Sequence, residues 1–355
     1  MEEVDFLSIY NGKKVLVTGH TGFKGSWMTK WLSMLGAEVK GYALAPENDF
    51  DLFHSAEIES CCQSIIANVL DLEKLKSEIN NFQPDFIFHL AAQPLVRLSY
   101  NYPVDTFNVN VMGTAHVLEA IRMLNKTAVI VMITTDKVYE NVEQDYYYKE
   151  SDRLGGYDPY SASKAAAELI ISSYRNSFFN NSEYDTHKKS IASARAGNVI
   201  GGGDWAKDRI IPDIVRSLYA NQDVEVRNPN AIRPWQHVLE PICGYLQLAA
   251  QISKNPLKYN SSWNFGPLKE DTFTVEDLVK ISIEKWGSGA YKIPNKMDAR
   301  HEAGLLKLDI QKSTNELSWH PKLNSKEAIE WTLDFYKSKD PKNYIEKQIK
   351  EYQER

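Results

Sequence analysis

The sequence predicts an α/β protein with a doubly wound parallel sheet and a smaller, mixed α/β C-terminal domain. Before residue 197, short apolar runs typical of buried parallel strands alternate with amphipathic segments, a rhythm that favours a parallel sheet with right-handed crossovers. After that point the hydrophobic periodicity becomes irregular. We therefore expect one domain over residues 1–197 and a second over residues 198–355, with some segments of the second returning to the sheet.

Composition and charge exclude several classes of protein. Of the 355 residues, 43% are hydrophobic and 25% charged, as in a globular protein rather than a disordered or fibrous one. The formal charge of -6 includes no basic tract, so nucleic acid is not an expected partner. Three cysteines, two of them adjacent, offer neither a disulfide framework nor a zinc motif, and no metal is expected.

Membrane insertion and export are not expected either. No apolar stretch approaches the roughly 20 residues that cross a bilayer. The first ten residues are acidic, whereas a signal peptide is basic and then apolar. These features predict a cytoplasmic protein.

The first strand, residues 14–17, runs directly into a glycine-rich turn. Gly19, Gly22 and Gly25 have the spacing G-x-x-G-x-x-G, and a helix over residues 26–35 follows. Glycines let the backbone approach a pyrophosphate, while the N–H groups and dipole of the new helix face its negative charge. The triplet alone also fits a plain strand-to-helix turn, but the strand before it and the helix after it favour dinucleotide binding.

Three further strands are expected at residues 38–44, 64–67 and 85–90. The first of these ends without the acidic residue that usually grips a ribose 2′-hydroxyl, and Glu47 is only a late substitute. The choice between NAD and NADP as the cofactor therefore stays open. Helices are expected at 72–79 and 103–124, and we interpret His89 and His116 as structural histidines.

Polar residues end the fifth strand. The apolar run 128–133 passes into Thr135, Asp136 and Lys137, at the carboxyl edge where parallel sheets place their chemistry. Tyr160 and Lys164 follow on a predicted helix, four residues apart and therefore on one face. If the two segments meet, a hydroxyl, a carboxyl, an ammonium and a phenol converge on one pocket.

The pair of Tyr160 and Lys164 has a specific chemical use. A lysine ammonium favours the phenolate of a neighbouring tyrosine, so we expect the pKa of Tyr160, ordinarily about 10, to be lowered. Beside a dinucleotide, such a general base would remove a proton from an alcohol as its hydride leaves. An ordinary exposed pair shows the same spacing, but the glycine loop and the polar strand end favour the functional interpretation.

A sixth strand, residues 191–196, precedes the second domain, in which a strand is expected at 224–226. Later helices are expected at 212–219, 241–251, 274–286 and 325–336. Residues 338–355 are predicted to form a charged, exposed helix. We interpret Asp309 and the string WNFG at 263–266 as structural.

Several strings resemble the extended short-chain dehydrogenase/reductase superfamily: TGHTGFKG at 18–25, HLAA at 89–92 and YSASK at 160–164. Within it, the chain resembles the nucleotide-sugar 4,6-dehydratases, and among these the branch that acts on CDP-D-glucose. The more specific strings are GHTGFKGSW at 19–27, GNVIGGGDW at 197–205 and RPWQHV at 233–238. The resemblance covers nearly the whole chain.

The resemblance implies a Rossmann domain that binds NAD through residues 1–197. The residues implied at the cofactor are Gly19, Thr21, Gly22, Phe23, Gly25, Asn68, Val69, Leu90, Ala91, Ala92, Tyr160 and Lys164. Asn68 departs from the Asp that many relatives place against adenine, although an amide can still accept a hydrogen bond there.

The resemblance also implies the reaction, which gives a 4-keto-6-deoxy sugar. Tyr160 would take the proton of the 4-hydroxyl as hydride passes to NAD, and Lys164 would hold the phenolate and the nicotinamide ribose. Thr135 would hydrogen-bond the 4-oxygen. Asp136 would protonate the departing 6-hydroxyl before hydride returns to C6.

Lys137 stands where dehydratases for dTDP-glucose or GDP-mannose carry a glutamate base for C5. A lysine can serve only when unprotonated, which burial and neighbouring cations favour. The alternative is that Lys137 merely pairs with Asp136. Both interpretations stay open.

The expected substrate residues lie in the second domain. Arg209 and Arg233 suit the substrate's pyrophosphate because planar forked donors match phosphate oxygens, and Asn198 would contact the same group. Trp205 and Trp235 fit the core and substrate contact equally well.

The resemblance implies a nucleotide sugar as partner and a role in deoxysugar biosynthesis, as for lipopolysaccharide. Relatives pair through the helices at 103–124 and 160–179, so a homodimer is expected and a tetramer stays open. Two alternative functions remain: a 4,6-dehydratase or 4-epimerase for a dTDP-, UDP- or GDP-linked sugar, and a non-enzymatic dinucleotide-binding sensor.

Overall fold

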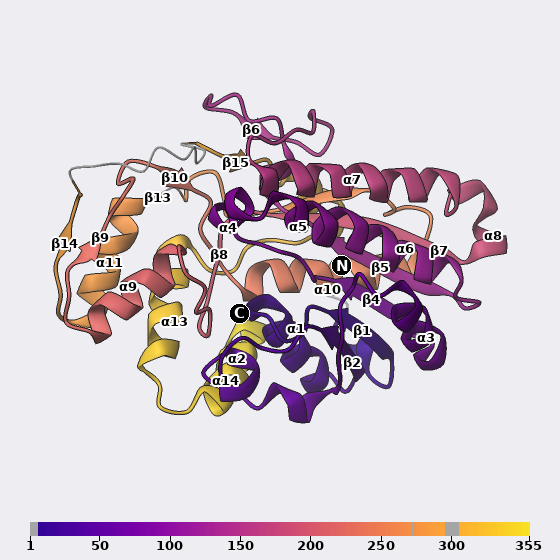
Figure 1. The fold of residues 1–355 in the computed structure, drawn as a ribbon, viewed down its shortest axis with the longest axis horizontal. Coiled ribbons are helices and arrows are strands. Elements are labelled where there is room, and N and C mark those ends of the chain that lie inside the picture. The colour runs from indigo at the N-terminus through magenta and orange to yellow at the C-terminus, as the bar shows by residue number, and fades with distance from the viewer. Residues whose placement is uncertain (1–5, 272, 295–304) are drawn as a thin grey trace.

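A seven-stranded parallel sheet forms the centre of the computed structural model, which describes residues 6–271, 273–294 and 305–355 (Figure 1). The strand order is β12-β7-β5-β4-β1-β2-β3. The strands are β1 (Lys14–Thr18), β2 (Glu38–Ala43), β3 (Gln63–Ile66), β4 (Phe86–His89), β5 (Ala128–Ile133), β7 (Lys189–Ala196) and β12 (Ser262–Phe265). The predicted fold class is confirmed, and the string WNFG at 263–266 supplies most of the edge strand β12.

Helices cover both faces of the sheet, and most residues of its central strands are buried. Val15 and Val17 face a core shared with α1 (Phe23–Met34) and α10 (Leu239–Lys254), whereas Leu16 between them faces the opposite core. The helices on that opposite side are α3 (Leu72–Phe82), α6 (Gly113–Arg122) and α7 (Pro159–Ser177). Successive side chains of a strand point to opposite faces, which explains the alternation.

The direction of the chain across the sheet reverses beside β1. From β1 the chain proceeds to β2 and β3 on one side, then returns to β4 and β5 on the other. In open parallel sheets such a reversal leaves a crevice at the carboxyl ends of the strands, because the connections diverge there. The glycine turn after β1 and the polar residues after β5 both lie at this edge.

Several helix boundaries differ from the prediction, and two of the differences lie close to the carboxyl edge of the sheet. α1 begins at Phe23 rather than at residue 26, because Gly22 serves as its N-cap. The expected helix over 103–124 is interrupted: α5 (Pro103–Phe107) passes into a π-helical turn (Asn108–Met112) before α6. Asn110 in that turn is buried, and its amide bonds both the Gln93 backbone and the Ser163 hydroxyl.

The C-terminal helix, α14 (Pro341–Glu354), is not the exposed helix that was predicted. Ile345, Ile349 and Tyr352 are fully buried on one of its faces. The Tyr352 ring packs edge-on against Trp31 of α1, and its hydroxyl donates to Glu240 of α10 at 2.7 Å. The prediction was wrong because charged residues outnumber the apolar ones, although the apolar residues recur at helical spacing.

The second half of the chain adds short strand pairs and a third core. The pairs join β8 (Val199–Ile200) to β11 (Gln236–His237), β9 (Val224–Glu225) to β14 (Tyr291–Lys292), β10 (Ile232–Arg233) to β13 (Phe273–Thr274) and β6 (Tyr147–Tyr148) to β15 (Lys307–Leu308). The core lies between α9 (Ile210–Tyr219), α11 (Val275–Trp286) and α13 (Ser325–Lys337). Thr274 and Asp277 form the predicted capping box of α11.

The remaining short helices are α2 (Leu52–Ser55), α4 (Val96–Asn101), α8 (Tyr184–His187) and α12 (Gln311–Leu317). Within the described ranges, no helix has both the length and the hydropathy of a bilayer-spanning segment.

Candidate active site

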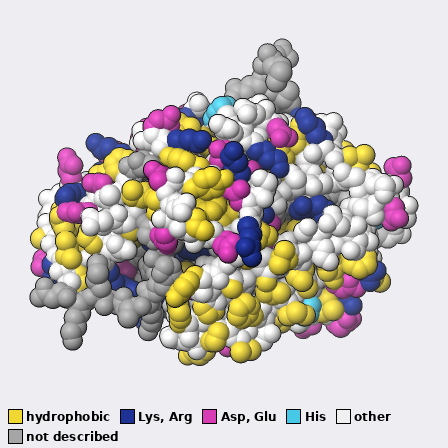
Figure 2. Space-filling view, turned by 90° about the horizontal axis from the view of Figure 1, so that it is seen from above, with side chains coloured by type: hydrophobic (Ala, Val, Ile, Leu, Met, Phe, Trp, Pro, Cys, Tyr) yellow, Lys and Arg dark blue, Asp and Glu magenta, His cyan; other side chains and the backbone are white. Residues whose placement is uncertain are grey.

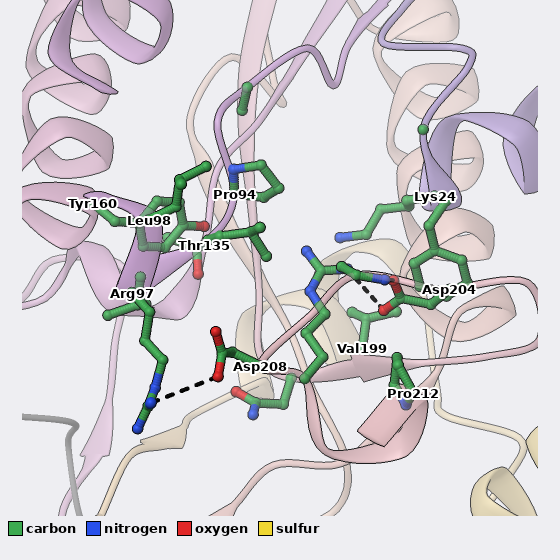
Figure 3. Close-up of a pocket in the computed structure, with 18 of the residues that line it drawn as sticks. Lys24, Pro94, Arg97, Leu98, Thr135, Tyr160, Val199, Asp204, Asp208 and Pro212 are labelled. Carbon is green, nitrogen blue, oxygen red and sulfur yellow. Dashed lines mark hydrogen bonds and ion pairs between the residues drawn. The ribbon is translucent and has the colours of Figure 1, made fainter. Parts of the chain in front are cut away.

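A cavity of about 1700 Å³ opens at the carboxyl edge of the sheet, between the two halves of the chain. Every residue predicted for the cofactor, the chemistry or the substrate lines this cavity. One wall comes from the strand ends and the glycine turn of the first half. The other comes from residues 197–235 of the second half, and Figure 3 shows side chains from both walls pointing into the space between them.

The glycine turn is shaped by close backbone approach. Gly19 has a φ of +78°, and a Cβ there would lie 2.7 Å from the backbone nitrogen of Ala91. A Cβ on Gly25 would lie 2.0 Å from the carbonyl oxygen of Gly19. A Cβ on Gly22, in contrast, would meet only that carbonyl, at 3.4 Å, so the backbone is bare on the side that faces the cavity.

The helix that follows can receive an anion. Its first backbone bond runs from the Ser26 N–H to the Gly22 carbonyl at 2.8 Å, so the three N–H groups before Ser26 lie in the unbonded first turn. Such groups and the helix dipole suit a pyrophosphate. The bare turn and the open helix terminus therefore fit a dinucleotide.

Local hydrogen bonds shape the adenosine end of the cavity. The Thr21 hydroxyl donates to the Leu44 carbonyl at 2.9 Å, and the Asn68 side-chain oxygen accepts from the Leu70 N–H at 3.0 Å. Leu90, Ala91, Ala92, Phe23 and buried Val69 line the same space. The predictions overlooked Asp51, which also lines it and accepts from the N–H groups of residues 47 and 48.

Thr135 and Asp136 form a buried pair beyond the end of β5. The Thr135 hydroxyl donates to Oδ1 of Asp136 at 2.9 Å. Asp136 is 1% exposed, and its Oδ2 has no hydrogen-bond partner among the described residues. A buried carboxylate oxygen without a partner is costly, which is typical of a site that awaits a ligand.

Helix α7 brings Tyr160 and Lys164 to the same place. Asp158 caps the helix by accepting from the Ser161 N–H at 2.9 Å, and Pro159 occupies its first turn. Tyr160 lies beside Thr135 in the cavity (Figure 3). The Lys164 amine donates to the Ile133 carbonyl at 3.1 Å, at the end of β5.

The pKa of each of these two side chains is set mainly by burial. Burial lowers the pKa of Lys164 to about 8, although the Glu168 carboxylate raises it. Burial raises the pKa of Tyr160 to about 12, opposed by the hydrogen bond with Thr135. The predicted lowering of the Tyr160 pKa is therefore wrong for this structure, because loss of solvent outweighs any effect of the neighbouring cation.

Lys137 lines the cavity and is partly buried. No ion pair joins it to Asp136; among the described residues, its amine has no hydrogen-bond or ion-pair partner. Its backbone N–H donates to the Thr135 hydroxyl at 3.4 Å. The alternative in which Lys137 merely neutralises Asp136 therefore finds no support in the geometry.

Arginines dominate the opposite wall. Arg209 pairs with Asp204 at 2.8 Å, and this carboxylate holds the pKa of the guanidinium above its usual range. Buried Arg233 donates to the Ile232 carbonyl at 3.0 Å, and Asn198 lies nearby on the cavity surface. Trp235 is buried and Trp205 packs edge-on against Tyr336, yet both also line the cavity.

Three further cavity residues were missed by the sequence predictions. Lys24 extends into the space from α1, and Arg97 of α4 pairs with Asp208 of the opposite wall at 3.6 Å (Figure 3). Only the position of Lys24 between two loop glycines could have signalled its role. The pairing of Arg97 with Asp208 depends on residues far apart in sequence. Within the described ranges, no cluster of His, Cys, Asp or Glu could hold a metal ion.

Comparison with known proteins identifies the family. Residues 16–332 match the family model described as GDP-mannose 4,6 dehydratase. The chain belongs to the GDP-mannose 4,6-dehydratase family. The predicted resemblance to the nucleotide-sugar 4,6-dehydratases is therefore confirmed.

Relatives of this family differ in activity. CDP-glucose 4,6-dehydratase of Salmonella typhimurium is 48% identical over 331 residues, which cover 93% of this chain and 92% of that protein. CDP-paratose 2-epimerase of Salmonella typhi is 26% identical over 355 residues, which cover 92% of this chain and 99% of that protein. A double mutant of dTDP-glucose 4,6-dehydratase from Streptomyces venezuelae, solved with NAD bound, shares the fold with a TM-score of 0.77. The two chains are 21% identical, and the match covers 92% of this chain and 97% of that one.

Proposed function

We propose that this chain dehydrates CDP-D-glucose to CDP-4-dehydro-6-deoxy-D-glucose, acting as a hydro-lyase with NAD as its cofactor. The observation that carries the proposal is that Thr135, Asp136 and Lys137 lie beside Tyr160 and Lys164 in one cavity. The 48% identity to a CDP-glucose 4,6-dehydratase supports the choice of nucleotide. Residues 1–197 would bind NAD, and residues 198–355 would bind mainly the sugar nucleotide.

The glycine turn would hold the pyrophosphate of NAD, and Asn68 with Val69 would face its adenosine. Leu90, Ala91 and Ala92 would support the middle of the molecule, and Lys164 would hold the nicotinamide ribose. Bound NAD would supply the acceptor for the C4 hydride, and the positive charge of its ring would lower the pKa of Tyr160. Buried Tyr160 would need this lowering of its pKa to act as a base.

The first chemical step is oxidation at C4. Tyr160 would accept the proton of the 4-hydroxyl, while Thr135 would hold the same oxygen in position. Lys164 would stabilise the resulting phenolate. The C4 ketone that forms makes the proton on C5 acidic.

The second step is loss of water. Lys137, unpaired and facing the cavity, would take the C5 proton, and Asp136 would give a proton to the departing 6-hydroxyl. Its unpartnered Oδ2 is the oxygen that would carry this proton. Return of the hydride to C6 and of the Lys137 proton to C5 would complete the product. Transfer of the proton held by Tyr160 to Asp136 through solvent would then restore both side chains.

Substrate recognition would depend on the second wall. Arg209 and Arg233 would bind the diphosphate and Asn198 would contact the same group. Incubating the purified chain separately with CDP-glucose, dTDP-glucose and GDP-mannose tests the proposal: a 4-keto product should form with CDP-glucose. Absence of that product would overturn it.

The alternatives give different outcomes. Asp136→Asn should abolish dehydration, whereas a simple 4-epimerase would barely change because epimerisation requires no water loss. A dinucleotide-binding sensor would bind NAD tightly and turn over no nucleotide sugar at all.

A homodimer is proposed on the basis of an exposed apolar surface. Val104 and Phe107 of α5, Met112 of the π-helical turn and Leu169 of α7 are 69%, 39%, 46% and 61% exposed. Figure 2 shows hydrophobic side chains gathered on this side of the molecule. Covering such a patch is the usual reason for association, and sedimentation analysis would distinguish a dimer from a monomer or tetramer.

The cytoplasm is proposed as the site of action, since Cys61, Cys62 and Cys243 are all free thiols, as expected in a reducing compartment. The product would enter deoxysugar biosynthesis, with lipopolysaccharide as a proposed destination.

A further inference from the structure

A buried pair of opposite charges lies directly behind the candidate active site. The side chains of Glu168 and Arg195 are each 3% exposed, and the guanidinium donates two bonds to the carboxylate, at 3.0 and 2.9 Å. Taking two charges out of water is costly and gains little net stability, so stability alone does not explain the pair. The proposed mechanism does not use it, although Glu168 lies only four residues from Lys164.

Helical spacing places Glu168 on the catalytic face of α7. Tyr160, Lys164 and Glu168 follow one another at intervals of four residues, so they occupy successive turns on one face of the helix. All three side chains are buried. Tyr160 and Lys164 line the cavity, whereas Glu168 lies behind them, one turn further along the helix.

Glu168 also holds the end of β5. The Thr134 hydroxyl donates to Oε1 of Glu168 at 2.6 Å. The carbonyl of the residue before Thr134 accepts from the Lys164 amine at 3.1 Å. The residue after it, Thr135, hydrogen-bonds Tyr160. A single contact with Glu168 therefore anchors the short segment that holds both members of the catalytic pair.

The other bonds of the pair keep the Glu168 carboxylate in place and charged. Ser193 of β7 donates to its Oε2 at 2.8 Å, and Arg195 also donates to the Tyr139 hydroxyl at 2.9 Å. Although burial raises the pKa of Glu168, the charge of Arg195 and the hydrogen bonds to the carboxylate lower it to about 2. Glu168 is therefore negatively charged throughout the pH range of an enzyme assay.

This fixed charge opposes the loss of the proton on Lys164. Burial lowers the pKa of Lys164 to about 8, and the Glu168 carboxylate raises it. Titratable groups on the elements around this amine are Lys24 of α1, His89 of β4, Asp136 beyond β5 and Tyr160 of the same helix. Burial lowers the pKa of His89 to about 3 and raises that of Tyr160 to about 12, so both are neutral near pH 7. Glu168 thus favours the protonated form of Lys164.

We propose that Glu168 is a positioning residue of the active site, which acts through Thr134 on the end of β5 and through its charge on Lys164. Arg195 holds the carboxylate in the geometry that both contacts require. Glu168 does not line the cavity, and no bond to the substrate or cofactor forms or breaks at it. The inference rests on the proposed function, in which the Lys164 ammonium stabilises the Tyr160 phenolate.

Titration of Lys164 in the chain without ligands tests the effect of the charge. The lysines of the purified full-length chain are acetylated with limiting acetic anhydride between pH 6 and pH 10, and mass spectrometry of the peptides gives a midpoint for each. Glu168→Gln keeps the shape of the side chain but removes its charge, so the Lys164 midpoint should fall by on the order of one pH unit. Glu168→Asp keeps the charge and should keep the midpoint near the wild-type value.

The pH dependence of kcat separates the charge from the hydrogen bond. With a lower Lys164 midpoint, the Glu168→Gln enzyme loses its Lys164 ammonium at lower pH. Its deficit relative to the wild type should therefore grow between pH 6.5 and pH 8.5, by a factor approaching about tenfold for a shift of one unit. Thr134→Val removes the hydrogen bond to Glu168 but no charge, so kcat should fall by the same factor at every pH.

Glu78→Gln is the matched control. Glu78 of α3 pairs with buried Lys40 at 2.8 Å and is not among the described residues that line the cavity. Its replacement should leave the Lys164 midpoint and the pH dependence of kcat unchanged.

A second variant covers misfolding of Glu168→Gln, which leaves buried Arg195 without its counter-charge. The double replacement Glu168→Gln, Arg195→Met removes both charges. It should still lower the Lys164 midpoint, since the charge that acts on Lys164 is that of Glu168.

The outcomes separate the two levels of inference. A folded Glu168→Gln protein with the wild-type Lys164 midpoint, or with the same deficit in kcat at every pH, overturns the role of the charge. Wild-type activity in Thr134→Val overturns the anchoring of β5. If the wild-type chain does not dehydrate CDP-glucose, the proposed function fails, while the titration without ligands still decides whether Glu168 controls the charge of Lys164.

Discussion

The two walls of the cavity carry positive charge in different ways. On the cofactor wall the cations are Lys24 and Lys164, whose pKa values burial lowers to about 7 and about 8. On the substrate wall they are arginines held by carboxylates: Arg209 by Asp204, and Arg227 by Asp208 at 2.9 Å. One wall can change its charge near neutral pH, whereas the other stays cationic.

This difference matches what each wall is proposed to bind. A nicotinamide ring gains and loses a positive charge during the reaction, so cations near it are best adjustable. A sugar-nucleotide diphosphate keeps its negative charge throughout, so permanent guanidinium groups suit it. The shape of the walls differs as well, since close backbone packing forms the first and ion pairs between side chains form the second.

The largest effect is expected at Lys137, where the two walls meet. Lys137→Met should lower the turnover of CDP-glucose by about 10²- to 10⁴-fold, because it removes the proposed base at C5. Binding of NAD and of sugar nucleotide should change little. Lys207→Met, an exposed lysine at the rim of the same cavity, is the control and should keep full activity. An unimpaired Lys137→Met enzyme would require another base.

Two glycine variants test whether backbone packing forms the cofactor wall. Gly25→Ala should lower the free energy of unfolding by about 1–3 kcal/mol, since its Cβ would lie 2.0 Å from the Gly19 carbonyl. Gly22→Ala should keep wild-type stability, because its closest contact would be 3.4 Å, but should weaken NAD binding. Thermal denaturation and NAD titration measure both effects. Equal losses of stability in the two variants would contradict the expected difference between the tightly packed Gly25 and the open Gly22.

Arg209 tests the permanent charge of the substrate wall. Arg209→Ala should raise the KM for CDP-glucose by about 10- to 100-fold, the expected loss for one or two charge-assisted hydrogen bonds. Arg209→Lys should recover part of this loss, since it restores charge but not the forked geometry. If the change weakens NAD binding instead and leaves KM intact, the assignment of the two walls is reversed.

The smallest expected effect is one of pH on substrate binding. Asp204 holds the pKa of Arg209 above its usual range, so this side chain stays charged as the pH rises from 6.5 to 9. The Kd of CDP-glucose, measured with the inactive Tyr160→Phe protein, should therefore vary by no more than about twofold. A tenfold weakening toward pH 9 would mean that a lysine, rather than the arginines, dominates the diphosphate site.

Much of the fold and the site could be predicted because its signals are local. Apolar runs such as 128–133 predicted strands, and glycine spacing predicted the turn, since each reflects interactions within a few residues. The register of Tyr160 and Lys164 on one helix face follows from helical geometry alone. The amphipathic face of α14 was present in the sequence too, but its many charges concealed it.

The sequence alone determined the parallel sheet, the dinucleotide turn, the family and most of the candidate site residues. Only the tertiary structure decided the direction in which the pKa of Tyr160 moves, the π-helical turn around Asn110 and the exposure of Lys24 to the active centre. Each of these depends on burial or on contacts and charges from other segments of the chain, as with Lys24 and Asp136, which are more than 100 residues apart. Local sequence patterns do not reveal these effects, because desolvation and Coulomb interactions between distant segments arise only once the chain has folded.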